Sequence, residues 1–236
     1  MNKPNLLFLH GALGSKSQFS PLIPFLKDTF QIHTLDFEGH GSSSLKDRTF
    51  RNVHFAENIL DYLNENSLSH VNIFGYSMGG HVGLYLAKTS PERVNKIFTL
   101  ASKFLWTPEI AEREAAFLDP DKIREKVPQF AKILEERHAV SGWKNVLQKT
   151  EEMFLMLGEE NILPVEDMGQ IPHGVRIGVG DKDHMVSIEE SVAVYRSLPE
   201  GELQIFPKTP HPLEKIPLSN LVHSLVDFFG EKGDRR

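Results

Sequence analysis

The chain has 236 residues, a length typical of one large domain or of a domain with a sizeable insertion. Its hydrophobic content of 40% is that of an ordinary globular protein, and its net charge of −6 excludes a global basic field for nucleic acid or anionic lipid. The sequence contains no cysteine, which excludes a disulfide framework, a thiolate metal site and a cysteine nucleophile. Any nucleophile must therefore be an oxygen or a nitrogen atom.

No apolar run approaches the ~20 residues that a membrane-spanning helix needs, so the sequence predicts no membrane insertion. The first 14 residues, MNKPNLLFLHGALG, share features with a signal peptide. However, Pro4 and His10 interrupt the apolar stretch, and no small-residue cleavage site follows. We therefore interpret this stretch as a buried strand and expect a cytoplasmic protein.

Short apolar runs alternate with amphipathic stretches along most of the chain, which is typical of a parallel sheet covered by helices on both faces. Apolar positions at three-to-four spacing predict helices over 18–27, 50–66, 78–88 and 218–229. The expected strands are 5–9, 31–36, 71–74, 94–100, 174–179 and 202–206. The predicted fold class is therefore α/β, with a doubly wound, mostly parallel sheet of six strands.

The segment 103–160 breaks this alternation, because it has no strand-like run and its pattern predicts three or four helices. Thr107 followed by Pro108 is typical of a helix start, Pro120 and Pro128 punctuate the next segments, and Gly158 is expected to close the last helix. An insertion between two strands can lie over the strand ends, where open sheets bind ligands. We predict a core of residues 1–102 and 166–236 and a helical cap, or lid, of residues 103–165.

The strongest chemical signal is Gly75-Tyr76-Ser77-Met78-Gly79, which directly follows an expected strand and directly precedes an expected helix. A G-x-S-x-G pattern needs glycine on both sides because the chain reverses so tightly that side chains there would collide. The serine is then held strained and exposed at the tip of the turn. The alternative interpretation is a tight strand-to-helix turn with an inert serine.

In this context the sequence resembles the α/β-hydrolase fold family, and the similarity extends along nearly the whole chain. His10-Gly11-Ala12 stands where the family has a His-Gly pair after a strand. The resemblance implies that the backbone N–H groups of Ala12 and Met78 form an oxyanion hole. We interpret His10 as a buried, hydrogen-bonded histidine and not as a base. The family's usual first two strands are expected to be missing, because this strand begins at residue 5.

The family's order of catalytic residues is serine, then an acid, then histidine, so the acid is expected after Ser77. The loop 180–186 resembles the family's G-x-x-D-x-x-V segment, which places Asp183 in the acid position and leaves Asp181 as the second candidate. The alternative is a purely structural turn before a helix capped by Ser187 in an S-x-x-E box.

His211 is the predicted base, because it lies in the loop between the last expected strand and the last expected helix. His184 is too close to Asp183 in sequence to receive its carboxylate, and His223 lies within an amphipathic helical pattern. Pro210 stands before His211, where the family usually has a small residue.

The sequence predicts no cofactor and no metal. Its eleven histidines show neither H-x-x-x-H nor H-E-x-x-H spacing, and no P-loop or dinucleotide fingerprint is present. The segment 36–43 resembles a structural loop of the same family, so we assign His40 no catalytic role.

These features predict a serine hydrolase that cleaves an ester or thioester of a small to medium acid through an acyl-enzyme. The candidate pocket residues in the cap are Trp106, Phe117, Trp143 and Met153, each of which has an alternative as ordinary cap core. Two other functions stay open: carbon–carbon bond hydrolysis, a lyase step or perhydrolysis at the same triad, and a receptor-like binding module that turns over slowly or not at all. We expect a small-molecule acyl substrate, no nucleic-acid partner, and a monomer or homodimer.

Overall fold

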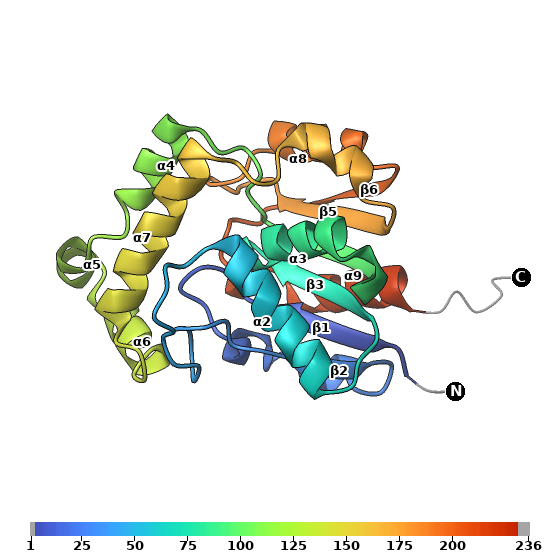
Figure 1. Ribbon diagram of the computed structural model, residues 1–236, viewed down its shortest axis with the longest axis horizontal. Coiled ribbons are helices and arrows are strands. Elements are labelled where there is room, and N and C mark those ends of the chain that lie inside the picture. The colour runs from blue at the N-terminus through green and yellow to red at the C-terminus, as the bar shows by residue number, and fades with distance from the viewer. Residues whose placement is uncertain (1–2, 231–236) are drawn as a thin grey trace, which may run out of the picture.

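A computed structural model describes residues 3–230, and a parallel sheet runs through the middle of this part of the chain (Figure 1). Its strand order is β2-β1-β3-β4-β5-β6, and every neighbouring pair is parallel. The strands are β1 (Asn5–Leu9), β2 (Gln31–Thr34), β3 (Val71–Tyr76), β4 (Val94–Leu100), β5 (Gly174–Gly180) and β6 (Glu200–Phe206). The predicted fold class, a six-stranded doubly wound α/β sheet, is confirmed.

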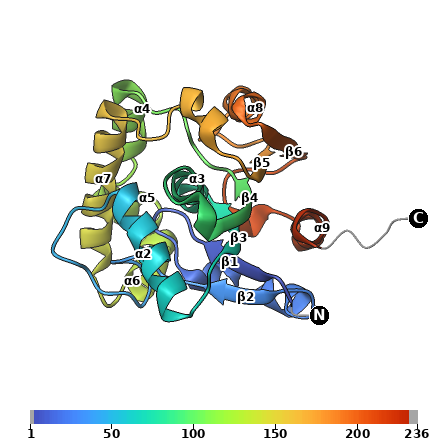
Figure 2. The same ribbon diagram turned by 45° about the vertical axis from the view of Figure 1, so that its right-hand side comes forward.

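Successive side chains along each strand point to opposite faces of the sheet and pack into two separate hydrophobic cores, one on each face. In β1, Leu6 and Phe8 pack into the core under α1 (Ile23–Leu26) and α9 (Leu218–Phe229). Leu7 and Leu9 point the other way, into the core under the helices of the opposite face. Those helices are α2 (Asn52–Glu65), α3 (Met78–Thr89) and α8 (Ile188–Ser197), and Figure 2 shows α9 across the sheet from them.

The structure differs from the sequence prediction at two early elements. The helix expected over 18–27 consists of a 3-10 turn, Lys16–Phe19, and the single turn α1, because Pro21 and Pro24 interrupt helical hydrogen bonding. The strand expected to reach residue 36 ends at Thr34. Asp36 instead turns its carboxylate to the N–H groups of Lys16 and Ser42, at 2.7 and 3.0 Å. Both differences lie next to the loop that carries Ala12.

Four helices separate β4 from β5, namely α4 (Pro108–Ala115), α5 (Pro120–Lys126), α6 (Pro128–Arg137) and α7 (Trp143–Glu159). Thr107 Oγ1 accepts the N–H of Ile110, and Asp119 Oδ1 accepts the N–H of Asp121, so both helix starts are capped. The four helices stand together beyond one end of the sheet (Figure 1).

All four helices fall within 103–165, the segment expected to form the cap. We call this segment the helical insertion. Its status as a separate domain stays a prediction. Residues 1–2 and 231–236 of the predicted core lie outside the described part of the chain. The longest described helix, α7, has 17 residues, and no helix between residues 3 and 230 has the length and apolarity to cross a membrane.

Candidate active site

Ser77 occupies a strained backbone position at the turn from β3 into α3. Its φ of 52° and ψ of −120° lie outside the regions that L-residues ordinarily adopt. The neighbouring strand holds this conformation, because the Ser77 N–H donates to Leu100 O at 2.8 Å and Ser102 Oγ donates to Ser77 O at 2.9 Å. These two hydrogen bonds therefore stabilise the strained conformation of the turn.

The two glycines of the motif are required by close backbone contacts. A Cβ on Gly75 would lie 2.4 Å from the Cα of Gly80, and a Cβ on Gly79 would lie 2.3 Å from Leu9 O. Neither position tolerates a side chain without a backbone shift. The crowding that the sequence analysis inferred for the G-x-S-x-G turn is present.

His211 and Asp183 form a hydrogen-bonded pair at the carboxyl end of the sheet. His211 Nδ1 lies 2.8 Å from Asp183 Oδ2. The Asp183 side chain is fully buried, and its other oxygen accepts the N–H groups of Met185 and Val186 at 2.8 and 2.9 Å. With the carboxylate fixed in this way, Nδ1 carries the proton and His211 Nε2 is left as a proton acceptor.

The geometry separates the two acid candidates. Asp181 Oδ1 accepts the backbone N–H of Thr209 at 3.1 Å. Asp181 therefore stabilises the loop before His211, whereas Asp183 binds the His211 imidazole. The two other late histidines, His184 and His223, are both exposed. The structure thus brings the predicted acid and the predicted base together, while Asp181 binds the backbone of Thr209.

Two further contacts hold the His211 loop, and the sequence analysis did not identify either. The Tyr76 hydroxyl donates to His211 O at 3.1 Å, and Gln18 Nε2 donates to Glu214 Oε1 at 3.0 Å. Tyr76 directly precedes Ser77, so its position in the motif was the available signal. These contacts join the segment after β1 and the end of β3 to the segment after β6.

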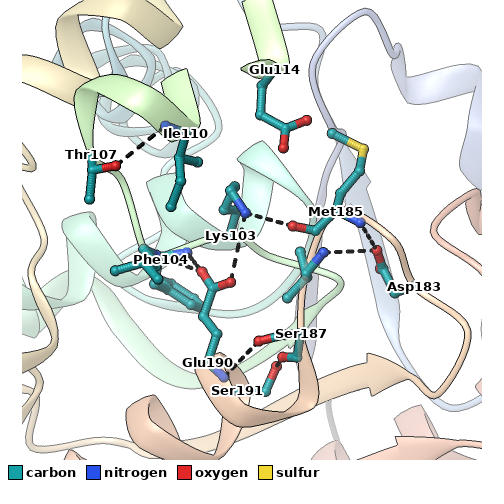
Figure 3. A network of polar contacts seen from close by, with 12 residues as sticks. Lys103, Phe104, Thr107, Ile110, Glu114, Asp183, Met185, Ser187, Glu190 and Ser191 are labelled. Atoms are coloured by element: carbon teal, nitrogen blue, oxygen red, sulfur yellow. Dashed lines mark hydrogen bonds and ion pairs between the residues drawn. The ribbon is translucent and has the colours of Figure 1, made fainter. Parts of the chain in front are cut away.

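A buried carboxylate links the acid loop to the start of the helical insertion (Figure 3). Ser187 Oγ accepts the Glu190 N–H at 3.0 Å, as the S-x-x-E pattern predicts. The Glu190 side chain, however, does not bond back to the N–H of Ser187, the N-cap residue of α8. It crosses to the insertion and accepts the N–H groups of Phe104 and Leu105 at 2.5 and 2.6 Å.

Lys103 completes this link. Its Nζ donates to Met185 O at 2.6 Å and lies 3.8 Å from Glu190 Oε2 (Figure 3). Both charged side chains are nearly buried, at 10% and 5% exposure, so each neutralises the other where water is scarce. Because Met185 also donates its N–H to Asp183, the acid loop and the entry to the insertion form one hydrogen-bonded unit.

His10 is a structural residue, in agreement with its interpretation from the sequence. It is fully buried, with Nδ1 2.8 Å from Gly11 O, and Nε2 accepts the Phe37 N–H at 3.1 Å. Burial lowers the pKa of His10 to about 4, and it lowers the pKa of the equally buried His81 to about 4. Both imidazoles are neutral in the folded protein at neutral pH.

These two histidines predict an acid-labile fold. In the unfolded chain each titrates near its ordinary pKa of about 6.5, so the unfolded state binds more protons than the folded state as the pH falls toward 4. The free energy of unfolding should therefore decrease by roughly 2 kcal/mol per histidine between pH 7.5 and 5. Urea denaturation at the two pH values measures the change, and His81→Phe should show about 2 kcal/mol less of it. An identical pH dependence in His81→Phe would refute the assignment.

Two cavities meet at Ser77 and His211. The larger, of about 680 Å³, opens between the sheet edge and the insertion, and the smaller, of about 30 Å³, lies deeper. Ala12, Ser77, Phe154, Met185 and His211 line both. The smaller cavity is further lined by Asn52, Met78, His81, Lys103, Trp106, Met153, Leu157 and Val186.

The four pocket candidates divide between different places. Trp106 and Met153 line the small cavity, and Phe117, with 70% of its surface exposed, lines the large one. Trp143 is not among the residues that line either cavity. It is 6% exposed, packs in the core of the insertion and has the Arg124 guanidinium 5.3 Å from the centre of its ring. The structure therefore does not bring Trp143 to either of these two cavities, and its ring lies against the Arg124 guanidinium of α5 instead.

Between residues 3 and 230, no three His, Asp or Glu side chains are grouped so that they could hold a metal ion.

Comparison with known proteins identifies the family. The profile described as alpha/beta hydrolase fold matches residues 4–138, which include the β1 loop, the Ser77 turn and the first three helices of the insertion. The chain belongs to the α/β-hydrolase fold family. Its relatives include two human serine hydrolase-like proteins and a pimeloyl-[acyl-carrier protein] methyl ester esterase of Nitrosomonas europaea.

Individual relatives cover different shares of this α/β hydrolase. A human serine hydrolase-like protein is 32% identical over 158 residues, 62% of this chain and 72% of that protein. A probable alcohol acetyltransferase of Cyberlindnera jadinii is 29% identical over 118 residues, 48% of this chain, and the chain spans about a third of that protein's length, 32%. Among solved structures, a 2-hydroxy-6-oxo-6-phenylhexa-2,4-dienoate hydrolase from Rhodococcus is similar with a TM-score of 0.78 and 25% identity, covering 96% of this chain and 90% of the other.

Proposed function

We propose that this α/β hydrolase is a serine hydrolase that cleaves an ester or thioester of a small to medium acid through an acyl-enzyme. Ser77 is the nucleophile, His211 the general base and Asp183 the acid that orients it. The observation that carries the proposal is the 2.8 Å contact between His211 Nδ1 and Asp183 Oδ2, beside cavities that Ser77 also lines. The strained Ser77 backbone supports it, because a serine presented in this way is typical of a nucleophile elbow.

In the proposed reaction, the bond from Ser77 Oγ to the carbonyl carbon forms as His211 Nε2 takes the serine proton. The N–H groups of Ala12 and Met78 stabilise the oxyanion that develops. The bond to the alcohol or thiol then breaks, and His211 returns the proton to the leaving oxygen or sulfur. Water attacks the acyl-enzyme with His211 again as base, which releases the acid and restores Ser77.

The two cavities suggest where the acyl group and the leaving group of an ester bind on either side of Ser77. We place the acyl group in the small cavity, because that cavity is lined by both proposed oxyanion donors, Ala12 and Met78. The leaving group then occupies the larger cavity, whose opening includes the exposed Phe117. On this proposal the helical insertion acts as the predicted cap, since it supplies walls to both cavities.

A panel of chromogenic acyl esters tests the proposal, with a dienone substrate for carbon–carbon cleavage alongside. Ester turnover above about 10⁻² s⁻¹ supports the enzyme, and slower turnover of every ester favours the receptor-like alternative. Preferential cleavage of the dienone would instead favour carbon–carbon hydrolysis, and the similar Rhodococcus structure is that of a dienoate hydrolase. A lyase step, perhydrolysis, or transfer of the acyl group to an alcohol would appear in the same assays as products other than the free acid.

Trp106 and Trp143 form a matched pair for testing the cap. Trp106→Ala should enlarge the small cavity and raise the kcat/KM ratio of octanoyl to butanoyl esters by more than about tenfold, which is ~1.4 kcal/mol of transition-state binding. Trp143→Ala removes the same side chain away from both cavities and should leave the ratio within about twofold. Equal shifts in the two variants, or none in Trp106→Ala, would contradict the placement of the acyl group.

We further propose a small-molecule acyl substrate as the partner, a monomer or homodimer as the working form, and a cytoplasmic location.

A further inference from the structure

Three side chains that line the small cavity carry buried polar atoms without a hydrogen-bond partner among the described residues. These atoms are His81 Nε2, Asn52 Oδ1 and Trp106 Nε1. Asn52 and His81 are each only 2% exposed. Buried polar atoms in proteins are nearly always paired, because an unpaired one costs about 1–3 kcal/mol. Three such atoms around one cavity therefore indicate that something bound in the cavity pairs with them.

The hydrogen-bonding state of these atoms follows from their neighbours. Asn52 Nδ2 lies 2.7 Å from His81 Nδ1, so the amide donates and Nδ1 accepts. A neutral imidazole that accepts at Nδ1 carries its proton on Nε2, which is therefore a donor. The indole Nε1–H of Trp106 is also a donor, and Asn52 Oδ1 is an acceptor. Two donors and one acceptor fit an oxygen atom of a ligand and not a hydrocarbon surface.

The charge around the cavity favours a neutral oxygen. Lys103 is the cation that lines the cavity, but its Nζ already donates to Met185 O and lies 3.8 Å from the Glu190 carboxylate. A substrate carboxylate would have to compete with Glu190 for this charge. A neutral oxygen needs no cation: a hydroxyl can accept the N–H groups of His81 and Trp106 and donate to Asn52 Oδ1, and an ether or carbonyl oxygen can accept the two N–H groups.

The size of the cavity limits the group that enters it. Its volume of about 30 Å³, against about 680 Å³ for the larger cavity, favours a short acyl group. Because Ser77, Ala12 and Met78 also line the cavity, such a group would be attached to the carbonyl that reacts. The oxygen would then stand on the α-carbon of a short acyl group.

We propose that His81, Asn52 and Trp106 form a specificity subsite, the polar acyl pocket, which selects esters of short acids that carry a neutral oxygen on the α-carbon. This inference rests on the proposed function, because it assigns the acyl group to the small cavity. It predicts that 2-hydroxy, 2-alkoxy or 2-oxo acyl esters are better substrates than fatty acyl esters of the same size. A site built to hydrogen-bond an oxygen rejects the analogue that lacks it, because its polar atoms are then left unpaired.

The experiment compares para-nitrophenyl methoxyacetate with para-nitrophenyl butyrate, which differ by one oxygen in place of one CH₂. Each kcat/KM is divided by the rate constant for hydroxide-catalysed hydrolysis of the same ester, which removes the intrinsic difference in reactivity. We expect the normalised ratio to favour methoxyacetate by at least about tenfold. His81→Phe keeps a ring stacked on Phe104 but removes both ring nitrogens, and it should bring the ratio close to one.

Controls separate this inference from the function on which it rests. His223→Phe makes the same substitution on the exposed face of α9 and should keep the wild-type ratio. Trp106→Phe removes one donor and should lower the ratio in part, which provides a second variant if His81→Phe does not fold. A wild-type ratio near one, with butyrate still hydrolysed, would overturn the polar acyl pocket alone. Failure to hydrolyse either ester would overturn the proposed function.

Discussion

Ser77→Ala is expected to lower kcat/KM for a substrate ester by roughly 10³- to 10⁶-fold while the protein stays folded. The loss follows from removing the oxygen that attacks the carbonyl, which leaves the oxyanion donors and the binding cavities as the remaining sources of catalysis. Folding should be preserved, because an alanine Cβ occupies the space of the serine Cβ. Steady-state ester hydrolysis together with circular dichroism measures both effects.

Two further variants make this result specific to Ser77. Ser191→Ala removes a buried hydroxyl from α8, away from both cavities, and should change kcat/KM by less than about threefold. The double variant of Ser77→Ala with His211→Ala should be little slower than Ser77→Ala alone, because the two residues act as one unit. Strictly additive losses in the double variant would show that His211 does not serve Ser77.

Asp183→Asn is expected to produce the second-largest loss, on the order of 10⁴-fold in kcat. The asparagine still offers an oxygen to the N–H groups of Met185 and Val186, so the loop should fold. Its amide nitrogen, however, would meet His211 Nδ1 as a donor. The imidazole would then carry its proton on Nε2, where it cannot take the proton of Ser77.

Asp181→Asn is the matched control, since Asp181 lies two residues away on the same loop. An asparagine there still accepts the Thr209 N–H, so kcat should fall by less than about tenfold. Measured pH profiles of kcat/KM for the two variants distinguish loss of the imidazole's partner from a simple loop effect. A larger loss in Asp181→Asn than in Asp183→Asn would exchange the roles of the two carboxylates.

The apolar runs were sufficient to predict the sheet, and the Ser77 turn has a local signal in its glycines, whereas Asp183 and His211 were assigned with the family resemblance as a guide. The strands appear as short apolar runs, and the Ser77 turn needs glycines wherever it occurs. Asp183 and His211 follow the strands whose carboxyl ends lie on the Ser77 side of the sheet. The strands and the glycine turn can be predicted from the sequence because they depend on local backbone geometry.

Features that depend on packing between distant segments could not be predicted in this way. Trp143 and Trp106 look equivalent in the sequence, yet of the two only Trp106 lines either cavity at Ser77, because the packing of the insertion helices sets which side chains face the sheet. Glu190 fits a capping box but binds the insertion 85 and 86 residues away.

His81 had a signal that the sequence analysis did not use. It lies four residues after Ser77, and residues at this spacing share one face of a helix. A histidine one turn beyond a candidate nucleophile at a helix start is therefore expected near the reacting group. Its partner Asn52 comes from the start of α2, and this pairing is visible in the fold alone.

The central claim, that Ser77 is the nucleophile activated by His211, is tested most directly by covalent labelling. The protein is incubated with a fluorophosphonate, and peptide mass spectrometry then locates the adduct. If Ser77 is the nucleophile, one adduct per chain forms on Ser77, is absent in Ser77→Ala, and forms more slowly in His211→Ala because the attacking oxygen lacks its base. Labelling of a different serine, or full ester hydrolysis by Ser77→Ala, would contradict this claim.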